Sequence, residues 1–232
     1  RNENDIYLFT NENMAETFCG KITIPMAGPV YGYDVWRNEL YEVRSEQKGK
    51  STTLHLQIPP YQSVVVVFDE VEDIELNSSI SYDEEFLLRD GWSMSICAAK
   101  EYPEFREKQK ISSFENVGLK YPDFSGFIRY ENTIEIPAVK RAVLLIEDAF
   151  EGVEVFVNDV SAGIQVASPF AFDISKLLRP GINKFRIEVA TTLERERYFA
   201  PPIPGDYFSS LSKGIVLAPT GIVGDVRLIM EK

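Results

Sequence analysis

The stretch Val153–Val189 reads VEVFVNDVSAGIQVASPFAFDISKLLRPGINKFRIEV and holds three strand-like runs that are separated by turn signals. Its first run, Val153–Val157, has valine at every second position, which is the period of a β-strand and not of a helix. Asn158-Asp159 follows this run. This pair predicts a turn, because both side chains can hydrogen-bond their own backbone and tolerate a positive φ.

The remainder of the stretch predicts two further strands and one short helical turn. An extended run restarts at Ala162–Ile164, and Ser168-Pro169 turns the chain towards Asp173. The Asp173 carboxylate is suited to cap the exposed amides of a helical turn. That turn ends at Arg179–Gly181, and the third strand covers Asn183–Val189.

Two segments that lie outside this stretch also have the form of strands in a β-sandwich. FSGFIRY at Phe124–Tyr130 has the form of a segment that leads into a core strand, and TGIVGDVRL at Thr220–Leu228 has the form of a closing strand. Together with the central stretch they resemble the galactose-binding-like jelly roll that is the sugar-binding domain of glycoside hydrolase family 2. They also resemble the C-terminal jelly roll of large bacterial α-L-rhamnosidases of glycoside hydrolase family 106. The resemblance covers roughly Gly91–Lys232.

The first 70 residues predict a small antiparallel β-sandwich, because they contain six short strand-like runs. These runs are Asp5–Phe9, Thr17–Ile24, Val30–Trp36, Glu39–Val43, Thr52–Ile58 and Val64–Phe68. The last of them is continuously apolar, which is typical of a strand that is buried on both faces.

This part of the chain resembles the end of the catalytic region in the same large hydrolases. The similarity rests on an IYLFTN strand at 6–11, a YDVWRNEL segment at 33–40 and a closing strand that ends in SVVVVF at 63–68. The resemblance implies that residues 1–70 pack against a catalytic domain that this sequence does not contain. One face of the sandwich should then be unusually apolar.

The fold class that we expect is therefore all-β, with a small antiparallel β-sandwich (residues 1–70) followed by a galactose-binding-like jelly-roll β-sandwich (residues 91–232). Residues 71–90 are rich in acidic side chains and predict a linker with one strand. Gly91–Cys97 should be the first jelly-roll strand, with Trp92, Met94 and Ile96 on one face. Lys100–Lys110 is highly charged and predicts a surface loop, and Thr133–Pro137 and Ala142–Ile146 predict two more core strands.

The composition excludes some classes of partner. The formal net charge is -12 and the sequence pI is about 4.7, so the surface repels the phosphate backbone and we expect no nucleic acid as a partner. No apolar run approaches the roughly 20 residues that span a bilayer, and no membrane span is expected. The chain begins with Arg1, so any targeting signal would lie upstream or have been removed.

The resemblance implies a secreted or periplasmic parent enzyme. Cys19 and Cys97 are far apart in the sequence. Both are interpreted as small buried apolar residues, with a disulfide between them as the alternative.

Catalytic residues are not expected in this chain. A Ser-His-Asp triad needs a histidine, and the single histidine, His55, lies in a strand pattern while no serine has a nucleophile-elbow context. Asp83–Glu85 and the pair Glu194 and Glu196 are dense acidic groups, but solvated faces account for them. In the families that the chain resembles, the catalytic carboxylates lie in a barrel domain outside this sequence. This chain alone should cleave nothing.

No organic cofactor is indicated, and no EF-hand or Cys/His zinc spacing is present. Jelly rolls of the class that the chain resembles often bind one structural calcium through oxygen ligands. A structural calcium therefore remains open.

The loop Thr191–Phe208, TTLERERYFAPPIPGDYF, is the candidate for carbohydrate binding. A sugar site needs an aromatic face for the pyranose ring and planar groups that bond hydroxyls. The loop supplies both types, as Arg195, Arg197, Tyr198, Phe199, Asp206, Tyr207 and Phe208. In the families that it resembles, this loop reaches towards the catalytic cleft, but those families have V-T-N where this chain has Ala190–Thr192. The alternative is that the loop aromatics, and likewise Trp36, pack against the domain body or a neighbouring domain.

The sequence thus predicts a non-catalytic, carbohydrate-associated accessory region of a larger glycoside hydrolase. It would brace the catalytic domain of the same polypeptide and lend a loop to glycan recognition. Two alternatives remain open, namely an independent carbohydrate-binding module and a purely structural or protein-binding domain.

Overall fold

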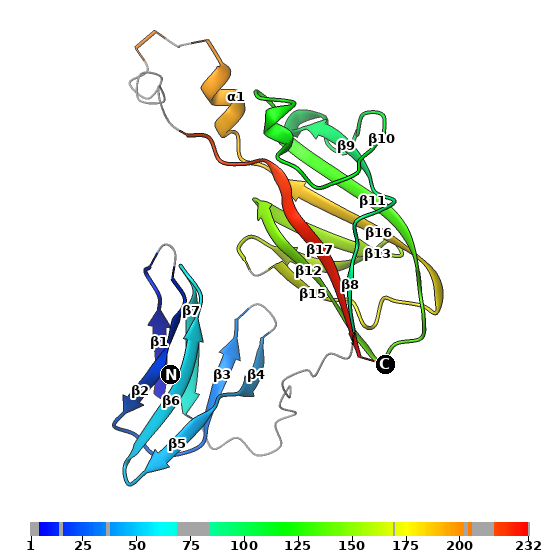
Figure 1. Ribbon diagram of the computed structural model, residues 1–232. Coiled ribbons are helices and arrows are strands. Elements are labelled where there is room, and N and C mark those ends of the chain that lie inside the picture. Colours follow the sequence, from blue (N-terminus) through cyan, green and yellow to red (C-terminus); the bar gives the residue numbers. More distant parts are fainter. Residues whose placement is uncertain are drawn as a thin grey trace. The chain divides into compact units, whose positions relative to one another are not determined.

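The structure is a computed structural model that describes residues 5–13, 16–35, 38–68, 84–168, 170–201, 204–205 and 216–231. The fold is all-β, as the sequence predicts, with antiparallel sheets throughout the described residues (Figure 1). The chain divides into two compact units, Arg1–Ser81 and Tyr82–Lys232. Among the described residues, no helix is long and apolar enough to cross a membrane.

The first unit is a sandwich of two antiparallel sheets. The four-stranded sheet has the order β1 (Asp5–Thr10), β7 (Ser63–Phe68), β3 (Val30–Asp34) and β4 (Glu39–Glu42), and the three-stranded sheet has the order β2 (Phe18–Ile24), β6 (Ser51–Ile58) and β5 (Ser45–Lys48). Leu54 in β6 and Val66 in β7 are fully buried, and both belong to the core between the two sheets of this unit. The six predicted strands are confirmed. Strand β5 was missed because SEQK is polar and exposed at all four positions and so shows no alternation.

The second unit packs a six-stranded sheet against a four-stranded sheet. The larger sheet has the order β10 (Gln109–Lys110), β9 (Ser93–Ala98), β11 (Gly126–Ile136), β16 (Gly181–Ala190), β13 (Gly152–Val157) and β14 (Val160–Gln165). The smaller sheet has the order β15 (Phe170–Asp173), β12 (Arg141–Phe150), β17 (Gly221–Glu231) and β8 (Glu84–Leu87). Two short 3₁₀ turns, η1 (Ala99–Glu101) and η2 (Val117–Leu119), lie between β9 and β11.

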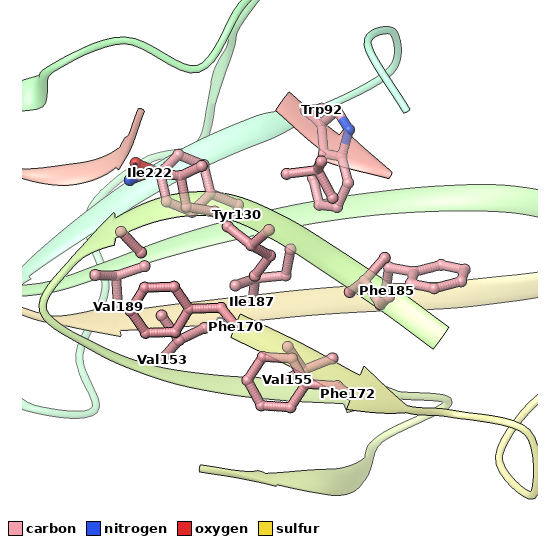
Figure 2. Packing of buried hydrophobic residues seen from close by; sticks show 14 of the residues in the cluster. Trp92, Tyr130, Val153, Val155, Phe170, Phe172, Phe185, Ile187, Val189 and Ile222 are labelled. Carbon is pink, nitrogen blue, oxygen red and sulfur yellow. Dashed lines mark hydrogen bonds between the residues drawn. The ribbon is translucent and has the colours of Figure 1, made fainter. Parts of the chain in front are cut away.

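The core of this unit is built by inward-facing residues of both sheets (Figure 2). Val153, Val155 and Val157 are fully buried, which confirms the alternation predicted for the first run of the deciding stretch. Phe170 and Phe172 meet them from the smaller sheet, and about 1.5–3 kcal/mol is gained for each fully buried side chain of this size.

The predicted turns also form. Asn158 and Asp159 have φ values of 52° and 66°, as a tight turn between β13 and β14 requires. The Ser175 amide donates to Asp173 Oδ1 at 2.9 Å, so Asp173 caps a single turn that ends before β16 begins at Gly181, where φ is 96°.

Three local expectations were wrong. Phe124–Tyr130 and Thr133–Pro137 contribute to one continuous strand, β11, and not to two, because Glu131 and Asn132 between them carry on its pairing with β16. The loop after β16 contains a short helix, α1 (Glu194–Phe199). Cys19 is exposed and not buried, because it shares the outward parity of its polar neighbours in β2.

Candidate functional site

Arg195 is the residue that fixes the loop after β16 to the body of the second unit. Its side chain is buried, and Nε donates to Thr220 Oγ1 at 2.6 Å. Nη2 donates to the Ala218 carbonyl at 2.6 Å, and Nη1 donates to the Pro122 carbonyl at 3.2 Å. The planar guanidinium thus joins α1 to two other segments, at Pro122 and at Ala218–Thr220, which a single ammonium could not do with the same geometry. In this structure Arg195 positions the loop.

Gly118 makes this arrangement of Arg195 sterically possible. A Cβ at Gly118 would lie 2.3 Å from Arg195 Cζ, so the guanidinium lies directly against the glycine backbone in η2. The next residue of α1 is held as well, because the Glu196 amide donates to the hydroxyl of buried Ser125 at 3.1 Å. These contacts explain why a six-residue helix forms without a side-chain cap at its first residue.

The other described residues of the predicted sugar site lie on the outside of α1. Tyr198 is half-buried and Phe199 is 49% exposed, and their ring centroids are 5.1 Å apart in an edge-to-face arrangement. Arg197 is exposed beside them. The structure therefore brings Arg197, Tyr198 and Phe199 together and turns Arg195 inward. Asp206, Tyr207 and Phe208, and likewise Trp36, lie outside the described residues.

The hollow at the base of α1 is too small for a sugar. It is lined by Phe150, Thr191, Arg195 and Pro219 among others, and its volume is about 10 Å³. This volume holds about one water molecule. Among the described residues of this loop, the groups that remain for contact with a glycan therefore lie on the outer side of α1.

The outward face of the six-stranded sheet carries a charge network that the sequence analysis missed. Arg129 donates to Glu188 Oε1 at 2.9 Å through both Nε and Nη2, and the Tyr102 hydroxyl donates to Glu188 Oε2 at 3.2 Å. Burial and the neighbouring Glu188 carboxylate raise the pKa of Tyr102. Arg129 also lies 3.7 Å from the centroid of the Phe105 ring, so this network fixes the segment after β9 onto the sheet. The alternation of side chains along each strand would have placed both Arg129 and Glu188 on this face. It could not have shown that the two residues lie directly opposite each other.

Two of the titratable groups weighed as catalytic, His55 and Glu85, have structural partners. His55 Nε2 lies 3.0 Å from Glu46 Oε1 on the exposed side of the first unit, and this hydrogen bond lowers the pKa of Glu46. Glu85 forms an ion pair with Arg227 at 3.2 Å, while Asp83 lies outside the described residues. Among the residues that the structure describes, no three His, Cys, Asp or Glu side chains gather where a metal ion could be held.

The first unit presents an apolar surface outside its core. On the outward face of the four-stranded sheet, two rows of directly paired positions run across the strands. We call the apolar members of these rows the apolar face: Ile6, Leu8, Tyr31, Tyr33, Leu40, Val65 and Val67. Ile6 is 57% exposed and Leu8 is 65% exposed. The expectation of an unusually apolar face on this sandwich is thus met at the β1–β7 side.

The outward face of the three-stranded sheet in the same unit is polar. There Lys21 pairs with His55 and Thr23 pairs with Thr53, whose hydroxyls lie 3.0 Å apart. In an antiparallel sheet with one face in water, polar side chains that point outward normally alternate along each strand with apolar side chains that point into the core. The four-stranded sheet departs from this pattern, because most of its outward side chains are apolar, with two of these exposed and five partly exposed. Apolar side chains that gather on a surface in this way are typical of an interaction surface.

No protein-family model matches the sequence, and no curated protein matches it significantly. Among solved structures, the chain is similar to a rhamnosidase from Novosphingobium sp. PP1Y, with 22% identity and a TM-score of 0.76. That match covers 100% of this chain and 23% of the rhamnosidase chain.

Two further solved structures match the chain in part. They are a Faecalibacterium prausnitzii β-glucuronidase (15% identity, TM-score 0.48, 66% of this chain and 32% of that chain) and a putative β-galactosidase from Bacteroides fragilis (18% identity, TM-score 0.42, 63% of this chain and 23% of that chain). The chain therefore has the fold of one part of a rhamnosidase and spans less than a quarter of that enzyme's length.

Proposed function

We propose that this chain is a non-catalytic accessory region of a larger, secreted or periplasmic glycoside hydrolase, in which the first unit braces the catalytic domain. The observation that carries this proposal is the apolar face of the first unit. Its seven side chains form two rows over four strands, and only Glu42 at the end of one row is charged.

The occupant of the apolar face is the catalytic domain of the same polypeptide. The supporting argument is that the fold match leaves about three quarters of the rhamnosidase chain unmatched, so a protein of that kind has further parts to cover this face. Interfaces between domains of one chain are commonly of this partly apolar kind. The assignment to family 2 or to family 106 is part of the proposal, and so is the carbohydrate that the enzyme acts on.

The experiment on the first unit uses a charge inserted into the apolar face. Leu8→Glu combined with Val65→Glu places two carboxylates at directly paired outward positions. The matched control is Thr23→Glu combined with Thr53→Glu, which changes a paired outward site on the polar sheet. The remainder of the hydrolase, produced as a separate chain, should form a complex with the wild-type chain and the control. The first double variant should not bind, although its circular dichroism spectrum is unchanged.

Two results would contradict the bracing role. One is the absence of any complex between the wild-type chain and the remainder of the hydrolase, measured by sedimentation. The other is a complex that survives both carboxylates, because burial of unpaired charges in an apolar interface costs several kcal/mol.

The loop after β16 gives the accessory region a second role in the proposal, which is to contact the glycan. Tyr198 and Phe199 offer apolar ring surface on the outside of α1. Calorimetric titration of the chain with rhamnose, galactose and plant-cell-wall oligosaccharides, repeated with Tyr198→Ala and Tyr207→Ala, tests this role. Binding by the chain alone that both variants abolish would favour an independent carbohydrate-binding module. Lack of binding at millimolar sugar would contradict an independent module and would favour a scaffold that contacts no glycan without its catalytic domain.

A further inference from the structure

The second unit contains a cavity whose lining includes no residue of α1. Its volume is about 220 Å³, and it is formed by the segment between β9 and β11 where that segment passes over the edge of the six-stranded sheet. Pockets for drug-sized ligands measure about 300–1,000 Å³. A cavity below that range suits a single small ring.

One side of the cavity is apolar. Met94 and Tyr130, both nearly fully buried, and Val117 line it together with half-buried Ile111. A ligand therefore needs one apolar face that can pack against these side chains. Inorganic anions lack such a face, whereas the C–H side of a pyranose ring supplies one.

Other residues that line the cavity form a chain of hydrogen bonds. Lys120 Nζ donates to Gln109 Oε1 at 2.9 Å, and Gln109 Nε2 donates to the Tyr121 hydroxyl at 3.4 Å. Lys120 Nζ also lies 5.3 Å from the centroid of the Tyr121 ring. This arrangement uses one of the three Lys120 hydrogens and leaves the Tyr121 hydroxyl hydrogen able to donate. These side chains thus present hydrogen-bond donors, and they suit a ligand that carries hydrogen-bond acceptors.

The charge at the cavity favours a negative ligand. Lys110 and Lys120 both line it, while its single carboxylate, Glu115, already accepts from the Ser113 hydroxyl at 2.7 Å. The hydrogen bond from Gln109 and the Lys120 charge lower the pKa of Tyr121, which makes its hydroxyl a stronger donor. This positive site occurs in a chain whose formal net charge is -12.

We propose that this cavity binds one pyranose ring that bears a carboxylate, that is, a hexuronic acid residue. Its carboxylate would lie against Lys120 and the Tyr121 hydroxyl, and its C–H face would pack on Met94 and Tyr130. The proposal does not depend on what covers the apolar face, and it requires no contribution from Tyr198 or Phe199.

The test is an NMR titration of the isotopically labelled chain with D-galacturonate, and with D-galactose as the uncharged match. Galacturonate should shift the amide signals of the segment 109–121 with a dissociation constant on the order of 1 mM, as expected for a ligand of so few atoms. Galactose should bind at least about tenfold more weakly, because it lacks the charged acceptor. Added salt should weaken the galacturonate interaction.

Three variants separate the cavity from non-specific binding. Lys120→Met keeps most of the side-chain length and should weaken galacturonate binding about tenfold, and Tyr121→Phe should weaken it about fivefold. Lys176→Met removes an exposed lysine in the turn after β15 and should leave binding unchanged. The signals of the core strands should be the same in all three variants, which excludes misfolding.

Several outcomes would overturn the proposal. They are the absence of shifts at about ten times the expected dissociation constant, equal binding of galactose, the same shifts with inorganic phosphate alone, and unchanged binding in Lys120→Met. None of them bears on the docking experiment, since none of these variants changes a residue of the apolar face.

Discussion

Arg195 and Gly118 show how a single residue pair positions the candidate loop. The sequence places two arginines in the ERERYF segment, and both were expected to face a sugar. In the structure Arg195 is buried while Arg197 is exposed. Sequence patterns could not distinguish them, because the partners of Arg195 include the carbonyl groups of Pro122 and Ala218, which any residue type supplies.

The Gly118→Ala variant tests this pair. The added methyl group would overlap Arg195 Cζ, so the guanidinium has to leave its three acceptors. We expect a loss of about 1–3 kcal/mol in the free energy of unfolding, measured by urea denaturation. Gly152→Ala is the control, since a Cβ there meets its nearest atoms at 3.8 Å, and it should change stability by less than about 1 kcal/mol. Equal stability of the two variants would contradict the proposed role of Gly118.

The conformation or burial of other single residues could be predicted from the sequence. The turn at Asn158 and Asp159 was predicted correctly, because the conformational tolerance of these residue types is a local property. The sequence predicts that Trp92, Met94 and Ile96 share one face, and all three are buried. The ion pair between Arg129 and Glu188 was not predicted, because it depends on the register between two strands that are distant in the sequence.

At the scale of elements, two asparagines join the turn after β13 to the segment before β16. Asn183 is fully buried, and its Nδ2 donates to the carbonyls of Arg179 and Gly181 at 2.7 and 2.9 Å. Its Oδ1 accepts from Asn158 Nδ2 at 2.9 Å, and Asn158 Nδ2 also donates to the Leu177 carbonyl. One polar cluster therefore holds the turn after β13 and the segment before β16 against each other.

Replacement of Asn183 by leucine should break this cluster. The volume is similar, but buried carbonyl and amide groups lose their partners, so the free energy of unfolding should fall by about 2–4 kcal/mol. Lys184→Leu at the next, exposed position is the control and should stay within about 0.5 kcal/mol. The contact between Lys184 and Asn158 uses the Lys184 backbone amide, so the control leaves it in place. Thermal unfolding followed by near-UV circular dichroism would show both effects.

The strands with clear alternation were predicted, and the elements that tertiary contacts impose were not. Strand β5 has no apolar residue, and it forms because β6 pairs with it across the Gly49 turn, where φ is 62°. Helix α1 is too short for sequence periodicity to reveal, and it is held by contacts from Arg195 and Ser125. The cavity was not predicted, because its two sides come from segments without any motif spacing.

The register of strand β12 shifts between Ile146 and Asp148. The Asp148 carboxyl at this position makes the stability of the folded chain depend on pH. Partial desolvation, and secondarily the adjacent Glu147 carboxylate, raise the pKa of Asp148, which is still exposed to water, above its usual value of 3.8. The folded chain is therefore destabilised as the pH rises from 3.8 through the raised pKa, because the carboxyl ionises there.

Asp148→Asn removes that effect and keeps the oxygen that accepts from the Ala149 amide at 2.9 Å. The variant should be more stable than the wild type at about pH 7, and the difference should close as the pH falls towards 3.8. Urea denaturation midpoints at several pH values measure both curves. A variant that is less stable than the wild type at neutral pH would contradict the expected sign.

At the scale of the whole molecule, acidity and the apolar face act against each other. The net charge of -12 keeps separate copies of the chain apart, while the apolar face favours their association. Composition predicted the first property, and the resemblance of residues 1–70 to the end of a catalytic region predicted the second. Which strands carry that surface could be known only from the pairing of β1 with β7 and of β3 with β7.

The isolated chain should therefore associate as the pH approaches the sequence pI of about 4.7. Sedimentation velocity should show a monomer near pH 8 and larger species near pH 5, because the repulsion between copies decreases. Leu8→Glu combined with Val65→Glu should stay monomeric over more of this range. The same association by the double variant would show that another surface is responsible.

The strand order of each unit also determines how late in synthesis its sandwich can be completed. In the first unit β1 pairs with β7, and in the second unit β8 pairs with β17, so the first described strand of each unit pairs with the last described strand of the same unit. Pairings of this length in sequence form slowly. Since β7 and β17 are the only neighbours of β1 and β8 among the described strands, we expect each sandwich to close on the ribosome only after that last strand has emerged.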